Sequence, residues 1–497
     1  MTITKLKTSN TLSAALEFLF DIVISFFIYK YIIKNLGLES LGVWALAISF
    51  TSLTSIGSSG FANSTVKFVS KYSFHRDYEK ISKVITTIAL TVFAFSLFLV
   101  IVVRVLLIFN YGLVLSHAEY LELSKILNVV FTSFIITSLA RVFLSSLDGL
   151  NMIYLRSRIG VSSKVMYAIS NIILVPIYGL IGLALAQLVL GITMLVLSFT
   201  VLCRKTPISL WSKSVFDRKV FKEIFSYGAY FQLSSILQFL SDPLTRFYLK
   251  NMGGLTAVGL FEVIYKLFFQ FRQLIVVVMH TQVPIVAHKY EFDRGAVKQI
   301  YLPFFDKVMV VSLFGMTIMY PFLPLIFTFF NIPQSGLSVS YVIMMSIGLY
   351  INLVASTAFI FNLGTGNIKL NTVSTAVFSC TNIIASYYLG KSFGATGVMV
   401  GWALAHIFSS VFLLSQFFKK ERIRLTELLN VKEVLVHLIL ILCISAIIIL
   451  QGRWNIYPSL IASGTIYLLF TIFFFTTSNK FKLIIFKMND LKQLFTK

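Results

Sequence analysis

The sequence KNLG at residues 34–37 recurs as KNMG at residues 250–253, which is 216 positions later. A second recurrence, at an offset of 215, joins YGLIG at residues 178–182 with FGATG at residues 393–397. In each copy the first motif follows an apolar stretch and the second precedes one. Repetition at a fixed period indicates that one structural unit occurs twice in the chain.

Apolar stretches of membrane-spanning length lie on either side of these motifs. Crossing about 30 Å of hydrocarbon takes about 20 helical residues. A helix satisfies its own backbone hydrogen bonds in lipid, whereas an open strand does not. The sequence therefore predicts an all-α, polytopic membrane protein with about 14 transmembrane helices. The predicted spans are residues 11–33, 41–62, 84–109, 126–147, 161–179, 180–202, 223–249, 257–280, 303–330, 339–361, 371–389, 395–418, 433–450 and 456–477.

The repeat divides these spans into two lobes of six. Six is an even number, so both lobes insert with the same polarity and are related by an axis along the membrane normal. We expect an N-lobe at residues 1–205, a basic cytoplasmic linker at 206–222 and a C-lobe at 223–420. Residues 421–497 then hold two extra helices and a basic cytoplasmic tail.

The composition argues against a soluble protein. Charged residues make up 12% of the chain and hydrophobic residues 57%, whereas a soluble domain carries about 25% charged residues. The 42 Lys and Arg against 19 Asp and Glu give a net charge of +23. Nucleic-acid binding would require these Lys and Arg residues to cluster on a water-facing patch. Here they lie between apolar stretches, so we expect no nucleic-acid partner.

The basic residues also predict the orientation in the membrane. With a cytoplasmic N-terminus, the inner segments carry 30 Lys and Arg, those of residues 148–164 included, and the outer segments carry 5. Short cytoplasmic loops are enriched in Lys and Arg. We therefore expect both termini to be cytoplasmic and the protein to contact membrane lipids along its length.

No pattern typical of an enzyme is found. The sequence lacks a P-loop, a G-x-S-x-G motif and an H-E-x-x-H motif, which mark common nucleotide-binding and hydrolytic sites. Neither the three cysteines nor the six histidines have metal-ligand spacing. We expect no enzyme activity, no cofactor and no metal site. The histidines, which we interpret as packed or interfacial residues, are His75, His117, His280, His288, His406 and His437.

Charged residues inside the predicted spans are the candidates for function, because such charges are unfavourable in lipid and usually functional. Arg272 has no acidic residue three or four positions away, and Arg141 has none within its span. Guanidinium groups bind phosphate through two hydrogen bonds. We predict that both arginines bind an anionic substrate; the alternative for Arg272 is a buried ion pair with another helix.

Two further acid–base pairs lie four residues apart in the second half of the chain. Asp242 precedes Arg246, and Glu262 precedes Lys266, so each pair can form an ion pair on one helix face. These four residues are either structural ion pairs or part of the substrate-binding site.

Glu17 and Asp21 are also four residues apart, but no basic residue lies within one turn of either. Two neighbouring carboxylates in a low dielectric repel each other, which favours protonation of one of them. We predict that they couple transport to H⁺ or Na⁺. The alternative is a salt bridge from these acids to Arg272 or Arg141.

Three motifs resemble a known family. LGLESLGVWAL at residues 36–46, DPLTR at 242–246 and YGLIGLALA at 178–186 are similar to the bacterial O-antigen and capsule polysaccharide flippases. These belong to the multidrug/oligosaccharidyl-lipid/polysaccharide exporter superfamily. The resemblance implies a V-shaped pair of six-helix lobes around a central cationic cavity. It places Asp242 and Arg246 in the cavity by motif, and Arg272, Glu17, Asp21 and Lys67 by helix membership alone.

Together these patterns predict a flippase of the bacterial cytoplasmic (inner) membrane. By alternating access it would move an undecaprenyl-diphosphate-linked oligosaccharide, an O-antigen or capsule repeat unit, from the inner to the outer leaflet. The membrane potential would assist, and a glycan polymerase of the same pathway is a possible partner. The alternative function is a cation-coupled exporter of small molecules or drugs with the same fold. The absence of long outer loops argues against a glycan polymerase or ligase.

Overall fold

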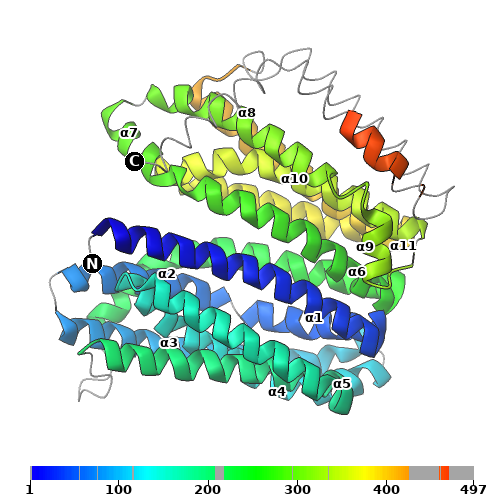
Figure 1. The fold of residues 1–497 in the computed structure, drawn as a ribbon, viewed down its shortest axis with the longest axis horizontal. Helices are drawn as coiled ribbons and strands as arrows, with labels where there is room; N and C mark the ends of the chain where they lie inside the picture. The colour runs from blue at the N-terminus through cyan, green and yellow to red at the C-terminus, as the bar shows by residue number, and fades with distance from the viewer. Residues whose placement is uncertain are drawn as a thin grey trace. The chain divides into compact units, whose positions relative to one another are not determined.

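The computed structural model describes residues 3–469, apart from 55, 75–76, 115–116, 208–217, 294, 334, 425–457 and 459–460. Its described part is helical, without strands, which confirms the predicted all-α class (Figure 1). The predicted span 433–450 and the basic tail lie outside the described residues. The helices are α1 (Ile3–Thr54), α2 (Ile56–Phe74), α3 (Tyr78–Val114), α4 (His117–Gly149), α5 (Ile153–Lys205), α6 (Arg218–His280), α7 (Gln282–Phe292), α8 (Ala296–Thr317), α9 (Leu323–Phe329), α10 (Gly336–Gly364) and α11 (Ile368–Glu421).

Seven described segments are long and apolar enough to cross a membrane. The four longest helices each contain a glycine with a backbone conformation that interrupts the helix: Gly37 (φ 82°), Gly179 (φ 56°), Gly254 (φ 76°) and Gly394 (φ 61°). Positive φ is disfavoured for residues with a side chain, so glycine suits these positions. A continuous helix of 53 residues, the length of α5, would extend about 80 Å, far more than the bilayer core.

The glycine kinks recur with the period of the sequence repeat. Gly179 and Gly394 are 215 residues apart, as the aligned motifs predict. Gly37 and Gly254 are 217 apart, whereas the sequence motifs align Gly37 with Gly253. The backbone therefore shifts the equivalence by one residue, because the repeated KN-x-G motif in α6 is followed by a second glycine that takes the positive φ.

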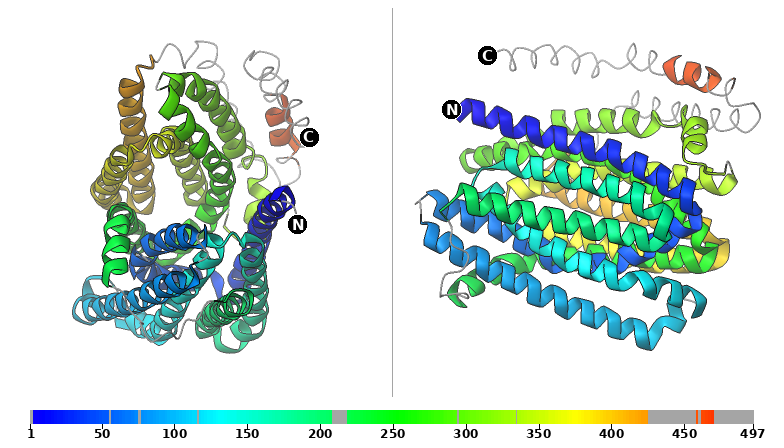
Figure 2. Two further views of the ribbon diagram at one scale, coloured as in Figure 1. Left: turned by 90° about the vertical axis from the view of Figure 1, so that its left-hand side faces the viewer. Right: turned by 60° about the horizontal axis from the view of Figure 1, so that its bottom comes forward.

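The chain forms two compact units, Met1–Glu262 and Val263–Lys497. In the N-terminal unit α4 packs against α5, α2 and α3 (Figure 2). Its core includes Ile85 of α3, Leu147 of α4 and Leu202 of α5, all fully buried.

The same unit contains a close crossing of α1 and α6, just beyond the kinks at Gly37 and Gly254. A Cβ atom on Gly42 would overlap the backbone carbonyl of Leu255, and a Cβ atom on Gly259 would overlap that of Leu38. Gly42 and Gly259 are 217 residues apart, and so are Leu38 and Leu255. The two contacts therefore join equivalent positions of the internal repeat: the glycine of each copy meets the leucine of the other copy.

A hydrogen bond lies at the same crossing. Thr256 Oγ1 donates to Glu39 Oε1 over 3.3 Å, and these two positions are again 217 residues apart. Small residues let membrane helices approach closely enough for backbone contact. We infer that Gly42 and Gly259 fix the distance between α1 and α6 at this point.

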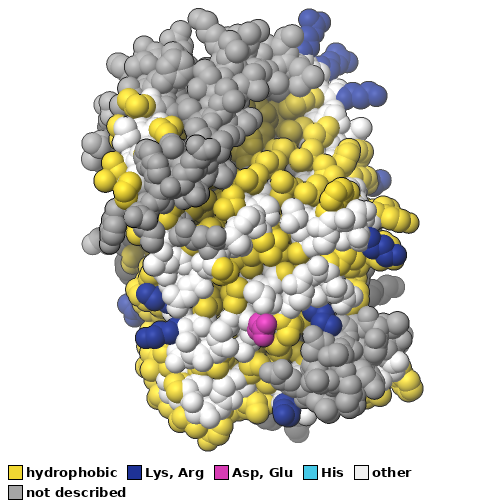
Figure 3. Space-filling view, turned by 90° about the vertical axis from the view of Figure 1, so that its right-hand side faces the viewer, with side chains coloured by type: hydrophobic (Ala, Val, Ile, Leu, Met, Phe, Trp, Pro, Cys, Tyr) yellow, Lys and Arg dark blue, Asp and Glu magenta, His cyan; other side chains and the backbone are white. Residues whose placement is uncertain are grey.

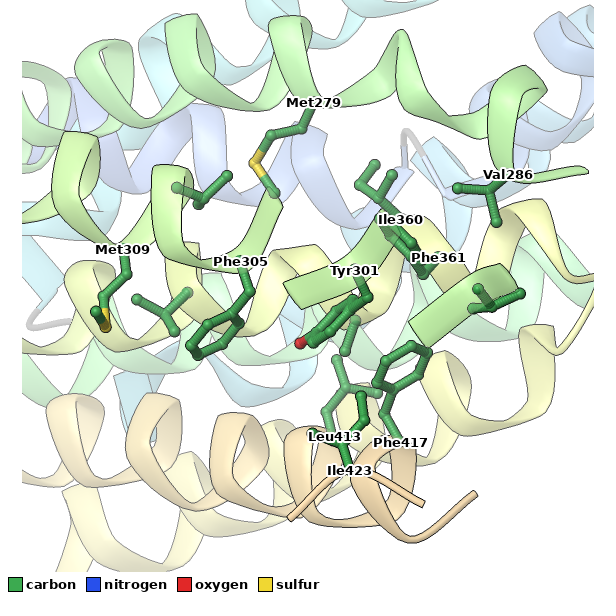
Figure 4. Packing of buried hydrophobic residues seen from close by; sticks show 14 residues of the cluster. Met279, Val286, Tyr301, Phe305, Met309, Ile360, Phe361, Leu413, Phe417 and Ile423 are labelled. Atoms are coloured by element: carbon green, nitrogen blue, oxygen red, sulfur yellow. The ribbon is translucent and has the colours of Figure 1, made fainter. Parts of the chain in front are cut away.

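The C-terminal unit has an aromatic core built from α8, α10 and α11. The Tyr301 ring lies 4.6 Å from that of Phe417 and meets Phe361 edge to face at 5.1 Å. Its hydroxyl is hydrogen bonded to Thr357 Oγ1 at 3.0 Å. Figure 4 shows this cluster with Met279 of α6 beside it.

Large apolar side chains are exposed along the described helices. In α3, Phe98 is 58% exposed and Ile101 53% exposed. One face of the molecule is covered mainly by hydrophobic and uncharged atoms, and most of its Lys and Arg side chains lie toward the margins (Figure 3). Such a surface suits lipid rather than water. The protein is therefore a multi-pass membrane protein.

We expect Gly259→Val to destabilise the protein by about 1–3 kcal/mol, because the added side chain would be forced against the Leu38 carbonyl. Thermal unfolding of the detergent-purified protein, followed by size-exclusion fluorescence, measures the effect. Gly336→Ala is the matched control, because a Cβ atom at Gly336 meets no atom within 4 Å. Equal melting temperatures for the two variants would contradict the inferred close crossing.

Candidate functional site

Two acidic residues of α1, Glu17 and Asp21, are paired with basic residues of α5. Glu17 Oε2 accepts a hydrogen bond from Arg156 Nη1 over 2.8 Å. Arg156 Nε also lies 3.8 Å from Asp148 Oδ2, at the end of α4. Asp21 forms an ion pair with Lys164. These side chains are partly exposed, between 21% and 36%, so the network is accessible rather than sealed in the core.

The two carboxylates belong to a polar stripe along α1. Glu17, Asp21, Ser25 and Tyr29 follow one another at intervals of four residues, which places them on one face of a helix. Ser25 Oγ lies 3.4 Å from Asp21 Oδ1. The exposed apolar residues Leu16, Leu19, Val23 and Phe27 occupy the opposite face.

Sequence reasoning missed the basic partners because it assigned residues 148–164 to an inner loop. The helix α5 begins at Ile153, so Arg156 and Lys164 lie within its first turns and face α1. Gly160 is the sequence feature that could have indicated these partners, because a Cβ atom there would overlap the Glu17 carboxylate. A glycine four residues after one base and four before the other therefore leaves space for an acidic side chain.

Arg246 is paired with Glu262 on the far side of the Gly254 kink. Arg246 Nε lies 2.5 Å from Glu262 Oε1, and the two side chains are only 13% and 11% exposed. The guanidinium also lies over the Phe261 ring, 5.6 Å from its centre. Tyr29 of α1 is near enough to interact electrostatically with both charges. The sequence spacing did not predict this pair, because it joins two segments separated by a kink.

Two other predicted residues are less defined. The side chain of Asp242 lies outside the described residues, although its backbone belongs to α6. Lys266 is half-buried on the same helix.

Arg272 lies in the C-terminal unit without an acidic partner among the described residues. Its Nε donates a hydrogen bond to Asn352 Oδ1 of α10 over 2.9 Å. The guanidinium lies 5.8 Å from the centre of the Phe269 ring. Neither contact neutralises its charge, and neither involves the two terminal nitrogens of the guanidinium group.

Arg141 on α4 is exposed and has no hydrogen bond or ion pair with any residue in the described part of the chain. Lys67 is exposed on α2. The structure therefore sorts the predicted basic residues into two kinds: Arg246 is neutralised by a carboxylate, and Arg272 and Arg141 are not. No group of three or more potential metal ligands occurs among the described residues.

Residues 8–290 match the family described as polysaccharide biosynthesis protein. The chain belongs to this family. A relative from Shigella flexneri, named "Putative O-antigen transporter", is 24% identical over 401 residues, which cover 77% of this chain and 91% of the relative.

Solved structures of similar fold are membrane transporters. The lipid II flippase MurJ, in an inward closed conformation, has a TM-score of 0.66 at 16% identity and covers 91% of this chain and 99% of its own. A multidrug resistance MATE family transporter of the MOP superfamily, in an inward-facing conformation, has a TM-score of 0.65 at 15% identity, with 82% and 94% covered. At these identities the likeness shows only that this chain shares the fold of both transporters.

We expect Arg246→Met to destabilise the protein by about 3–5 kcal/mol, because it leaves the Glu262 carboxylate buried without its partner. The double variant Arg246→Met/Glu262→Met removes both charges and should recover most of that loss. Chemical or thermal unfolding of the purified protein measures both. A double variant that is no more stable than Arg246→Met would show that the ion pair does not explain the loss.

Proposed function

We propose that this protein is a flippase that moves an undecaprenyl-diphosphate-linked oligosaccharide, an O-antigen or capsule repeat unit, across the bacterial cytoplasmic membrane. It would carry the substrate from the inner to the outer leaflet by alternating access, with both termini of the protein in the cytoplasm. Family membership, the O-antigen transporter relative and the MurJ fold all support a transporter rather than an enzyme.

The observation that carries the proposal is the uncompensated charge of Arg272. A cation in a membrane helix is unfavourable unless an acid or a ligand neutralises it, and the contacts of Arg272 are the neutral Asn352 and an aromatic ring. Phosphate oxygens match a guanidinium group in charge and geometry. Arg141 would act as a second ligand, and Lys67 could attract the headgroup from α2. Arg246 would contribute less, because Glu262 already neutralises it.

The membrane potential favours this direction of transport. Moving one negative charge outward across an inside-negative membrane releases about 2.3 kcal/mol per 100 mV. A diphosphate anion would therefore be driven outward even without a coupling ion. On this proposal the released glycan is passed to a polymerase of the same pathway.

The acids of α1 could add ion coupling. Protonation of Glu17 would release Arg156 from its ion pair, and protonation of Asp21 would release Lys164. Binding of H⁺ would thus leave a cationic side chain without its carboxylate partner. A cation-coupled exporter of small organic cations is the alternative function. It is less well supported, because a site for cations needs unpaired carboxylates and these two are paired with bases.

We expect cells that carry Arg272→Ala to lose most of their surface glycan, because the phosphate loses its ligand. Arg272→Lys should restore it only in part, since an ammonium group cannot form the paired hydrogen bonds. The measurement is glycan staining in a strain that lacks the gene and is complemented with each variant, with membrane levels checked by blot. Lys391→Ala is a matched basic control, because Lys391 packs on Tyr387 and has no charged partner there.

Surface glycan that persists without the gene would contradict the flippase proposal. The cation-coupled exporter would then become the leading function. Normal glycan in Arg272→Ala cells, with the gene itself required, would keep the flippase but remove Arg272 from its site.

Ion coupling has its own test. We expect the Glu17→Gln/Asp21→Asn double variant, reconstituted in vesicles, to lose any dependence of lipid-linked glycan transport on a proton or Na⁺ gradient. Transport that still follows the gradient would remove these two acids from the coupling mechanism. Glu39→Gln, at the crossing of α1 and α6, is the acidic control.

A further inference from the structure

A histidine that the sequence analysis interpreted as a packed or interfacial residue lies on α11, one of the helices around Arg272. His406 of α11 is close enough to the Arg272 guanidinium for electrostatic interaction. Its Nδ1 atom is buried and has no hydrogen-bond partner among the described residues. A buried polar atom without a partner is unfavourable, and a native structure that keeps one calls for an explanation. A ligand that binds at Arg272 would supply the missing partner.

The imidazole ring is held in place by its neighbours. It lies 4.3 Å from the Trp402 ring and 4.4 Å from the Phe378 ring, centre to centre. Gly348 of α10 leaves the space beside it: a Cβ atom there would lie 3.1 Å from Trp402 and 3.5 Å from His406 Cβ. The ring is thus fixed by packing and not by its own polar atoms, which leaves those atoms for another purpose.

Arg272 is oriented by the same group of helices. Asn352 of α10 accepts the Nε hydrogen bond, which fixes the plane of the guanidinium. On α6, Tyr265 stacks on Phe269 at 5.1 Å and meets Trp402 of α11 edge to face at 6.3 Å. Residues of α6, α10 and α11 therefore surround one guanidinium group and one imidazole ring, all within the C-terminal unit.

We propose that Arg272 and His406 together bind one phosphate group of the lipid diphosphate, with Asn352 as the positioning residue of Arg272. This inference rests on the proposed function. The terminal nitrogens of Arg272 would donate two hydrogen bonds to phosphate oxygens, and His406 would donate a third from Nδ1–H. The imidazole N–H thus adds one hydrogen-bond donor to those of the guanidinium group. The aromatic neighbours keep water away from these hydrogen bonds.

The test measures binding of undecaprenyl diphosphate to the purified full-length protein in nanodiscs by native mass spectrometry or thermophoresis. We expect His406→Leu to weaken binding about tenfold and Arg272→Leu to weaken it at least as much. The double variant should lose much less than the product of the two effects, because both residues act on one phosphate. His406→Asn places an amide N–H near the position of Nδ1 and should bind more tightly than His406→Leu.

Two further probes identify the bound group. Undecaprenol, which lacks phosphate, should bind equally to wild type and all variants. Inorganic diphosphate should compete with undecaprenyl diphosphate if the headgroup is recognised without its lipid, and fail to compete if the lipid is required. Either result is compatible with the phosphate site and separates the two sources of the phosphate.

Binding by His406→Leu equal to that of wild type would overturn the proposal, and so would strictly multiplicative effects in the double variant. If His406→Leu does not fold, the comparison of His406→Asn with His406→Gln replaces it, since only asparagine mimics Nδ1 in position. These outcomes are distinct from failure of the proposed function. A flippase that needs Arg272 in cells but shows no coupling to His406 would lose this inference alone.

Discussion

A charge inside a lipid bilayer needs an opposite charge or a ligand, and this requirement organises the polar residues of the chain. Glu17 and Asp21 meet it through Arg156 and Lys164. Within the described helices, Arg272 meets it neither through an acid nor through water-exposed surroundings, because it lies half-buried beside an amide and aromatic rings. The distinction between neutralised and uncompensated bases, rather than the number of bases, marks where an anion can bind.

The sequence predicts the features that depend on local patterns. Apolar stretches of membrane-spanning length became helices because each helix satisfies its own backbone hydrogen bonds. The boundary between the predicted spans 161–179 and 180–202 coincides with the kink at Gly179. Two glycines follow KNM, and both Gly253 and Gly254 permit a positive φ. In the structure Gly254 adopts it.

Local sequence patterns could not predict the ion pairs between helices or across a helix kink. Arg156 and Glu17 are 139 residues apart, and their contact depends on where α5 begins and which face it turns toward α1. Arg246 and Glu262 are 16 apart, but a kink between them changes the spacing that helical periodicity assumes. The same limit applies to His406, whose proximity to Arg272 follows from the packing of α6, α10 and α11. The packing and kinking of the helices determine which acidic and basic side chains form ion pairs.

The crossing at Gly42 and Gly259 has the form of a two-fold dimer interface. In such an interface each subunit presents the same patch, so that a residue contacts its partner's counterpart and the reverse contact also exists. Here Gly42 approaches Leu255 while Gly259 approaches Leu38, and both patches belong to one chain. Because one chain contributes both patches, a substitution at Gly42 changes only one of the two contacts, whereas in a symmetric dimer it would change both. The two copies can therefore differ in sequence: Glu17 and Asp21 lie on α1 in the first copy, and uncharged residues stand at the equivalent positions of the second.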